Sequence, residues 1–549
     1  MIRSGRTDHQ PGSPTPVNAG QHDFDLIVIG GGINGVGIAR DAALRGLKVC
    51  LLEQGDLCNG TSRWCSRLIH GGLRYLEHAE FSLVRESLRE REVLLHIAPH
   101  LVEPLAMLVP LYAGARRGRW LVGAGMWLYD LLSWDKSLPK HRMLDVQEAL
   151  RLAPGLRPEG LVGAAHYFDA QVAFPERLVI ENALSAVEAG ASIRSYCRVD
   201  RILVRDRRLA GVRYTDLRND TQHDLTAARA VNAAGPWVDR VLDGLDRELP
   251  DFMGGTKGTH IITRRFEGAP ETACYVEAHS DGRPFFILPW NGLLLIGTTD
   301  IRYAGNPGEV NADPAELDYL SSETNHVFPG AKLDRHRILY HYTGVRPLPK
   351  REKGSEGAIT RRHSIRHHRR VCRGLYSVIG GKLTTYRNLA EEMTDRIVRS
   401  LSVRARASET AARPLPGATV PLSEVDRTLR SYQAMSDASR EHLLAVYGAR
   451  ALEVASLTER SPELGDVICP ATHAIAAEIV FAFEQEMATT LSDVLMRRSM
   501  IGLAPDLGAA ALPGALSAAR RFLGWDRARA DQEERRHLRT IAVLRSGLN

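Results

Sequence analysis

Glycines and one acidic residue near the N-terminus have the types and spacing that bind a dinucleotide. Gly30, Gly32 and Gly35 form a G-x-G-x-x-G motif between the apolar run at 25–29 and a helical pattern over 34–45. The first glycine permits a tight turn, the second a close backbone approach to a pyrophosphate, and the third close packing of helix on strand. Glu53 ends a second expected strand over 48–52, where a carboxylate can bond both ribose hydroxyls and repel a 2′-phosphate. The predicted contacts are Gly30, Gly31, Gly32, Asn34, Gly35 and Glu53.

The choice between FAD and NAD depends on a later segment. Residues 229–235 read Arg-Ala-Val-Asn-Ala-Ala-Gly, a strand of small residues that ends in glycine. A chain that returns to its cofactor about 200 residues after the first motif is typical of FAD-binding folds. This favours FAD, with Ala234 and Gly235 as contacts, and leaves NAD as the alternative.

Composition limits the class of protein that presents these groups. The chain has 549 residues, of which 44% are hydrophobic and 25% charged, as in ordinary globular domains, and its length allows about three folding units. The net charge of +6 is spread along the chain, so we expect no nucleic-acid partner. The seven cysteines are scattered without metal-ligand spacing, which predicts no metal site and a reducing compartment.

A pass along the chain suggests its organisation. Residues 1–22 are polar and resemble a disordered tail rather than a secretion signal, and no apolar run is long enough to cross a bilayer. Helical patterns occupy 80–96 and 172–190, and residues 422–545 are helix-like throughout. The basic segment 361–373 fits a solvated loop or edge strand better than a polyanion site.

Longer motifs add a family resemblance. Residues 61–77 read TSRWCSRLIHGGLRYLE, and with the glycine motif they closely resemble FAD-dependent glycerol-3-phosphate dehydrogenases of the respiratory, aerobic type. The resemblance covers about residues 23–540. The other matching segments, in order, are 231–239, 257–260, 287–290, 297–300, 344–348, 380–387 and 490–503.

The resemblance implies an α/β fold in three parts. A Rossmann-like FAD-binding domain of the glutathione-reductase/D-amino-acid-oxidase type is expected over 23–90, 165–255 and 350–400. An antiparallel-sheet substrate domain is expected over 91–164 and 256–349, and a C-terminal α-helical domain over 410–549. The implied reaction oxidises sn-glycerol 3-phosphate to dihydroxyacetone phosphate by hydride transfer to FAD, and membrane quinone takes the electrons.

Oxidation of a secondary alcohol requires a base for the hydroxyl proton and cations for the phosphate. We expect His70, whose neighbours are glycines, to be the base or a donor beside the flavin. Arg74 and Tyr75 suit a phosphate or a developing oxyanion. Arg346, in a Gly-Val-Arg-Pro segment, matches the substrate arginine of the family.

The segment Gly380-Gly-Lys-Leu-Thr-Thr385 is expected to begin a helix whose N-terminus faces the flavin. Lys382, one of only eight lysines, adds a full positive charge for flavin or phosphate. We also expect Thr385 to be a catalytic residue. The expected cofactor contacts from this segment are Gly380, Gly381 and Thr384.

One stretch departs from the family pattern. The family has a run of small residues and then Ser-Lys before Leu-Ile-His-Gly-Gly, whereas here residues 63–65 read Arg-Trp-Cys and Arg67 replaces the lysine. Cofactor contacts by Thr61, Ser62 and Ser66 are still expected. The family also implies that Val199 meets the adenine. Lys257 and His260 are expected to be strand residues, with direct substrate contact the less favoured alternative.

The segment 116–134 begins basic and continues aromatic and apolar, a composition that suits insertion at a membrane interface as well as ordinary core packing. Since quinone lies in the membrane, we expect a cytoplasmic protein peripheral on the inner face of the cell membrane. A homodimer is one alternative for its assembly. The rival functions are a glycerol-3-phosphate oxidase using O2, an FAD-dependent amine or amino-acid oxidase, and a nucleotide-binding regulatory protein without catalysis.

Overall fold

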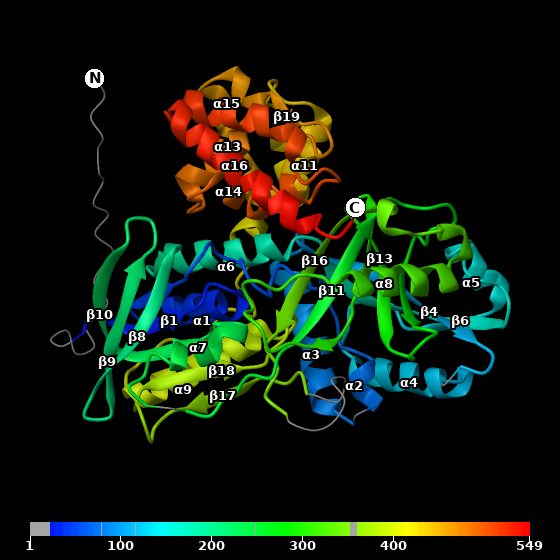
Figure 1. The fold of residues 1–549 in the computed structure, drawn as a ribbon, viewed down its shortest axis with the longest axis horizontal. Helices are drawn as coiled ribbons and strands as arrows, with labels where there is room; N and C mark the ends of the chain where they lie inside the picture. The colour runs from blue at the N-terminus through cyan, green and yellow to red at the C-terminus, as the bar shows by residue number, and fades with distance from the viewer. Residues whose placement is uncertain (1–21, 78, 116, 248, 352–359, 549) are drawn as a thin grey trace.

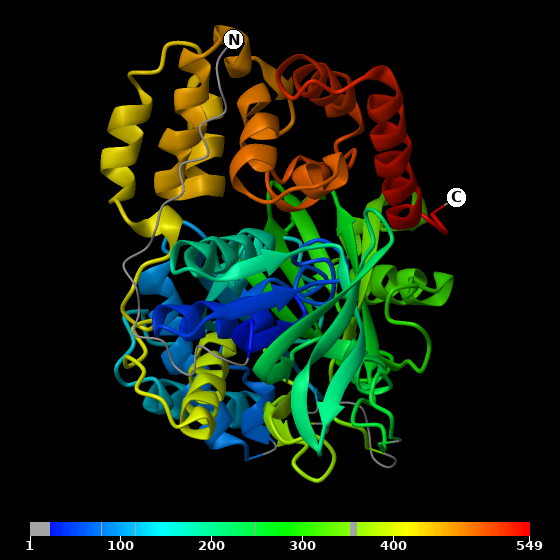
Figure 2. The same ribbon diagram turned by 90° about the vertical axis from the view of Figure 1, so that its left-hand side faces the viewer.

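The computed structural model describes residues 22–77, 79–115, 117–247, 249–351 and 360–548, and the side chain of Arg74 lies outside this description. Two large sheets lie side by side, and a layer of helices from the C-terminal part covers one end of both (Figures 1 and 2). Most of the expected tail at 1–22 falls outside the described residues.

The first sheet is mainly parallel, with the strand order β17-β18-β10-β1-β2-β7. Its central strand β1 pairs in parallel with β2 on one side and β10 on the other. An antiparallel extension, β8 and β9, continues from β10. The strands are β1 (Phe24–Ile29), β2 (Val49–Leu52), β7 (Ser192–Arg194), β8 (Cys197–Arg205), β9 (Arg208–Asp216), β10 (Thr221–Asn232), β17 (Ser364–His367) and β18 (Leu375–Ile379).

Both faces of this sheet are covered. Leu26 and Val28 of β1 pack with α1 (Ile33–Leu44), α6 (Pro175–Glu188) and α9 (Tyr386–Leu401). The alternate residues of β1 belong to a cluster with β8, β9 and α7 (Val238–Leu242). A strand buried on both faces explains the unbroken apolar run Leu26–Ile29.

The second sheet is mainly antiparallel, with the order β15-β11-β14-β13-β12-β4-β6-β3, to which β16 adds at β11 and β5 at β6. Its strands are β3 (Leu68–Ile69), β4 (Val102–Tyr112), β5 (Arg142–Leu144), β6 (Leu161–Val172), β11 (Thr256–Thr263), β12 (Ala273–Glu277), β13 (Pro284–Trp290), β14 (Leu293–Gly297), β15 (Ile301–Arg302) and β16 (Ile338–Arg346). The helices beside it are α2 (Arg74–Glu77), α3 (Phe81–Ile97), α4 (Arg119–Leu132), α5 (Val146–Leu152) and α8 (Pro314–Val327).

The second sheet takes in residues that the sequence analysis assigned to the FAD-binding part. β6 pairs with β4 along its whole length, up to Val172, and β3 pairs with the end of β6. The expected boundary at residue 165 therefore falls inside a strand. The short β3 takes the chain from the first sheet into the second sheet just before His70.

The C-terminal helical part rests on both sheets. It holds α10 (Leu422–Leu429), α11 (Asp437–Tyr447), α12 (Ala451–Ser456), α13 (Ala476–Gln485), α14 (Leu491–Arg497), α15 (Leu512–Phe522) and α16 (Arg527–Leu544), with a small hairpin of β19 (Val467–Cys469) and β20 (Ala474–Ile475). Tyr340 of β16 donates a hydrogen bond to the carbonyl of Leu503, which ties this part to the second sheet.

Candidate functional site

The dinucleotide motif forms a strand–turn–helix that only glycine permits. Gly30 has φ of 110°, in the left-handed region, and a Cβ on Gly35 would lie 1.9 Å from the carbonyl oxygen of Gly30. The 12-residue helix α1 follows directly, with Gly32 as its N-cap and no side-chain hydrogen bond from that cap. The N–H of Ile33 donates to Ser62 instead, and the first turn of α1 borders the cavity, where an anion could meet its positive end.

Glu53 lies beside this turn, as expected. Its Oε2 accepts a hydrogen bond from the N–H of Gly31 at 2.6 Å, and its Oε1 accepts one from Gly55 at 2.8 Å. Burial raises the pKa of the Glu53 carboxyl, and the two N–H donors act in the opposite direction. The carboxyl group faces the cavity, where its free lone pairs can accept from ribose hydroxyls.

A cavity of about 1150 Å³ runs from this turn between the two sheets and under the C-terminal helices. Most of the predicted site residues line it. They are Gly30, Gly32, Asn34, Glu53, Thr61, Ser62, Ser66, His70, Tyr75, Val199, Ala234, Gly235, Arg346, Gly381, Lys382 and Thr384.

The other predicted site residues have different positions. Gly31 and Gly35 shape the turn behind the wall, and Gly380 has φ of 79° in the chain reversal before α9. Thr385 is buried as the N-cap of α9 without a side-chain capping bond. Arg74 begins α2, but its side chain lies outside the described part of the chain.

The expected helix start at Gly380–Lys382 is wrong by several residues. Gly380 and Gly381 both have positive φ, which right-handed helix does not allow, and α9 begins at Tyr386. Lys382 and Thr384 therefore reach the cavity from an irregular loop. The backbone N–H of His70 donates to Oγ1 of Thr384 at 3.2 Å and holds this loop against the loop after β3.

His70 lies on the cavity wall with its ring at the edge of Phe286. Burial, and then the positive charge of Lys382, lower the pKa of His70 to about 3. The imidazole is therefore neutral near pH 7 and a weak base, and negative charge bound beside it would raise its pKa.

Lys382 lines the same cavity as His70, and its amino group is only partly protonated near pH 7. Its Nζ donates to Oγ of Ser87 at 2.9 Å and lies 4.2 Å from the ring centroid of Tyr75. Burial lowers the pKa of Lys382 to about 7, and the carboxylates of Glu86 and Asp169 oppose that shift. An anion in the cavity would favour the protonated form.

Arg346 is held rigidly at the end of β16. Its guanidinium contacts Oδ1 of Asp300 at 3.0 Å, Oγ1 of Thr298 at 3.0 Å and nearby backbone carbonyls. Arg361 approaches the second oxygen of Asp300 at 3.6 Å and also lines the cavity. Two guanidinium groups on one carboxylate leave a net positive charge in this corner.

Arg361 is not among the predicted site residues, because the basic segment 361–373 has the composition of a solvated face. That interpretation fits β17, an exposed edge strand, but it is wrong for Arg361. The sequence pattern around Arg361 is the same as that around the exposed residues of β17. Only the packing of the segment against Asp300 distinguishes them.

The residues that depart from the family pattern are packed into the wall of the cavity. Arg67 forms a two-bond ion pair with Glu176, each bond 2.9 Å long, and its guanidinium lies over the Trp290 ring. Trp64 stacks on Tyr342, with the guanidinium of Arg63 3.6 Å from the Trp64 ring centroid. The larger residues therefore form part of the cavity wall, and Ser62 still lies beside Gly32.

The hydroxyl groups of this loop already have protein partners. Thr61 donates to the carbonyl of Val345 at 2.6 Å, Ser62 accepts from the N–H of Ile33 at 3.0 Å, and Ser66 contacts Nε2 of His260 at 2.9 Å. His260 is buried in β11 behind Ser66. Lys257 is also a β11 residue, paired with Glu316 at 2.7 Å.

The residues present fit FAD. The left-handed glycine turn, the first turn of α1 and the half-buried Glu53 match the diphosphate and ribose, and one continuous cavity extends from them to His70 and Lys382. The model for the FAD dependent oxidoreductase family matches residues 25–396, and that for the C-terminal domain of alpha-glycerophosphate oxidase matches residues 408–530. Fold and site together define an FAD-dependent oxidoreductase.

Individual relatives narrow the class. A glycerol-3-phosphate dehydrogenase from Synechocystis sp. is 46% identical over 523 residues, covering 93% of this chain and 95% of the relative. A D-erythritol 1-phosphate dehydrogenase from Brucella abortus is 39% identical, covering 86% of this chain and 94% of its own. The crystal structure of glycerol-3-phosphate dehydrogenase from Bacillus halodurans, complexed with FAD, superposes with a TM-score of 0.76 at 27% identity over 97% of each chain. The chain belongs to the FAD-dependent glycerol-3-phosphate dehydrogenase family.

Proposed function

We propose that this chain oxidises sn-glycerol 3-phosphate to dihydroxyacetone phosphate with FAD as the hydride acceptor. The observation that carries the proposal is a single cavity in which the dinucleotide turn, a neutral histidine and a cluster of cations meet. A neutral amine or amino-acid substrate would have no use for three cationic side chains, Arg346, Arg361 and Lys382, at one end of the site.

Each residue has a proposed task. Bound FAD supplies the two-electron acceptor that oxidation of an alcohol requires. His70 accepts the hydroxyl proton, because its neutral ring lines the cavity and the charge of a bound phosphate raises its pKa toward the range of a general base. Arg346 and Arg361 bind the phosphate, and Asp300 fixes their orientation. Lys382, with Tyr75 against it, stabilises negative charge near the reacting oxygen.

An exposed apolar helix surface supports a membrane partner. On α4 and just after it, the side chains of Trp120, Trp127 and Trp134 are 93%, 65% and 77% exposed. Met126 and Tyr129, on the other side of α4, are buried. Exposed aromatic residues on one side of a helix fit insertion into the headgroup region of a bilayer. In the described part of the chain, no helix has the length and apolarity to cross a bilayer.

This surface is connected directly to the site. Tyr129 of α4 accepts a hydrogen bond from the N–H of Gly71 at 3.0 Å, next to His70, and donates to Asp169. α4 lies at the lower edge of the molecule in Figure 1, away from the C-terminal helices. A membrane surface so close to His70 favours quinone as the electron acceptor. We therefore propose a peripheral protein on the inner face of the cell membrane.

One experiment tests the reaction. Anaerobic addition of sn-glycerol 3-phosphate to the purified protein should bleach the visible absorbance of its oxidised flavin, and absence of bleaching would refute the proposal. Reoxidation by a quinone in vesicles and by O2 then separates the dehydrogenase from an oxidase. D-erythritol 1-phosphate and an amino acid serve as comparison substrates, and faster bleaching by either would change the assigned substrate.

A further inference from the structure

The loop from Glu53 to Asn59, here called the 53–59 loop, carries the carboxylate for the ribose, and it is held from two sides. On the side of the first sheet, the N–H of Cys197 donates to the carbonyl of Glu53 at 2.7 Å, and that of Tyr196 to the carbonyl of Gly55 at 2.8 Å. These contacts come from the same sheet as Glu53 itself. The other side of the loop is held by a distant part of the chain.

Asp56, at the middle of the loop, is paired with two consecutive arginines of the C-terminal helical part. Its Oδ1 accepts from Nη2 of Arg498 at 2.8 Å, and its Oδ2 accepts from Nη1 of Arg498 and Nε of Arg497, each at 2.5 Å. Asp56 is only 1% exposed. Burial raises the pKa of the Asp56 carboxyl, but the two guanidinium groups outweigh it and the net shift is downward. Asp56 and its two arginine partners thus form a charged and buried cluster.

Arg497 reaches both the loop and the cavity. It ends α14, where Asp493 accepts from its Nη2 at 2.6 Å and also from the hydroxyl of Tyr196 at 2.8 Å. Arg497, Asp493 and Tyr196 line the cavity together with Glu53 and Asn59. α14 therefore closes a ring of contacts around the 53–59 loop.

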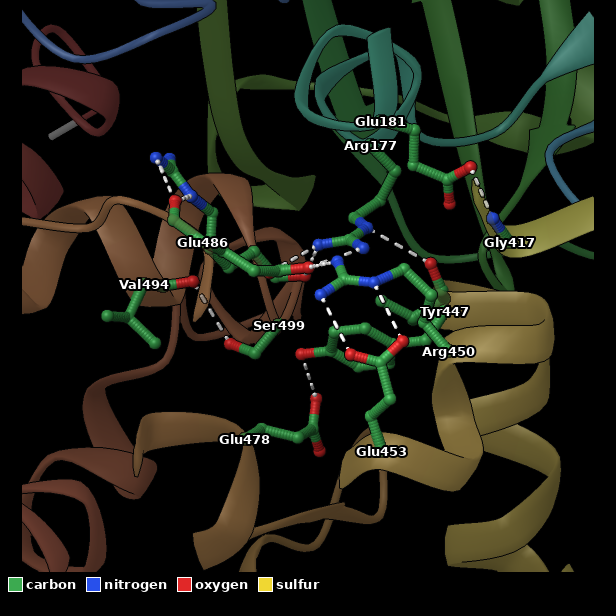
Figure 3. Close-up of polar contacts among 12 residues, drawn as sticks. Arg177, Glu181, Gly417, Tyr447, Arg450, Glu453, Glu478, Glu486, Val494 and Ser499 are labelled. Carbon is green, nitrogen blue, oxygen red and sulfur yellow. Dashed lines mark hydrogen bonds and ion pairs between the residues drawn. The ribbon is translucent and has the colours of Figure 1, made fainter. Parts of the chain in front are cut away.

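A second buried network holds the same interface and does not contact the 53–59 loop itself. It adjoins Arg498, which donates to the carbonyl of Glu486 at 3.1 Å and whose own carbonyl accepts from Arg177 at 3.5 Å. Arg177 of α6 forms two hydrogen bonds with Glu486, at 2.7 and 2.9 Å, and Glu486 also pairs with Arg450 (Figure 3). The interface thus contains one arginine pair on the 53–59 loop and another arginine away from it. This difference provides a matched control.

We propose that Arg497 and Arg498 are positioning residues for FAD, which hold Glu53 in place through Asp56 so that seating of the C-terminal helical part and binding of the adenosine end of FAD are coupled. Removal of one charge from a buried pair leaves the other uncompensated, and the loop would then be free to relax. Coupling is reciprocal, so bound nucleotide must also stabilise α14 against opening. The proposal rests on FAD as the cofactor, not on the identity of the alcohol.

Nucleotide affinity of the full-length, deflavinated protein is the primary measurement. Arg497→Lys keeps the charge but loses the planar guanidinium with its several N–H donors, and it should raise the Kd of FAD about tenfold. Asp56→Asn should raise this Kd by at least as much. ADP, which occupies only the adenosine end, should lose affinity by a similar factor. Nucleotide affinity is measured without the alcohol, so this result holds whether or not glycerol 3-phosphate is the best substrate.

Arg177→Lys is the control, because Arg177 contacts Arg498 only at its backbone carbonyl, so this variant weakens the interface and keeps both guanidinium groups on Asp56. It should lower the melting temperature while the Kd of FAD and ADP changes less than about twofold. Hydrogen exchange gives a second readout: ADP should slow exchange in α14 of the wild type but much less in Arg497→Lys. Unchanged nucleotide affinity in Arg497→Lys, or an equal loss of affinity in Arg177→Lys at the same change in melting temperature, would overturn the proposal. If Asp56→Asn does not fold, the Arg497→Lys and Arg177→Lys pair decides alone.

Discussion

The backbone N–H of His70 donates a hydrogen bond to Oγ1 of Thr384, although 314 residues separate the two in the sequence. This contact joins the loop after β3 to the loop before α9 and brings Lys382 to the wall that holds His70. The charge of Lys382 then acts with burial to keep the histidine neutral. The proposed base and the proposed cation are therefore one electrostatic unit, and the predictions below test each part of it.

Replacement of His70 should remove the proton acceptor without removing the cofactor. We expect His70→Gln to slow anaerobic flavin bleaching by about a hundredfold to ten-thousandfold, the range for loss of a general base. The flavin absorbance of the purified variant should remain. His166→Gln, on a half-buried histidine outside the cavity, is the control and should bleach at the wild-type rate. Wild-type bleaching in His70→Gln would exclude His70 as the base.

Lys382 should give anion binding a pH dependence near neutrality. Its pKa is lowered to about 7, so below this pH the ammonium form predominates and above it the charge is lost. Sulfate, a dianion throughout this range, should compete with substrate more weakly as the pH rises through 7, by up to about tenfold per unit. Lys382→Arg keeps its charge and should flatten this profile. A profile of unchanged slope in that variant would assign the titration to another group.

The arginine pair on Asp300 should determine affinity for the phosphate. Arg346→Gln and Arg361→Gln should each raise the KM for glycerol 3-phosphate about tenfold to a hundredfold, because each loses a charge-assisted hydrogen bond. The double variant should lose less binding free energy than the two single variants add up to, since both arginines share Asp300. Arg213→Gln, which breaks an exposed pair with Asp224, should leave the KM unchanged. An unchanged KM in Arg346→Gln would show that Arg346 does not bind the phosphate.

The exposed tryptophans of α4 should govern membrane association. Trp120→Glu and Trp127→Glu should weaken sedimentation with phospholipid vesicles by at least about tenfold, because burial of each aromatic side chain in the interface is lost. Turnover with a water-soluble acceptor should persist, while turnover with a quinone in vesicles should fall. Leu538→Glu, on the exposed side of α16, is the matched control. Equal vesicle binding by all variants would rule out α4 as the contact.

The parts of the structure that depend on neighbouring residues were predicted well. The turn at Gly30, the helix from Ile33 and the carboxylate at Glu53 follow from spacing within one β-α-β unit. The α/β fold with its antiparallel sheet and C-terminal helices is also confirmed. The start of α9 was misplaced, because the positive φ of Gly380 and Gly381 is a choice that glycine permits but does not dictate.

The sequence by itself determined the dinucleotide-binding motif and the family to which the chain belongs, because glycine geometry and motif spacing are local. Tertiary structure decided what lies around that motif. The pairing of Arg67 with Glu176, the approach of Arg361 to Asp300 and the hold of Arg497 on Asp56 each join distant segments. A guanidinium gives the same local signal whether it is solvated or buried. Its role is set by the carboxylate that packing brings to it, and no spacing along the chain encodes that partner.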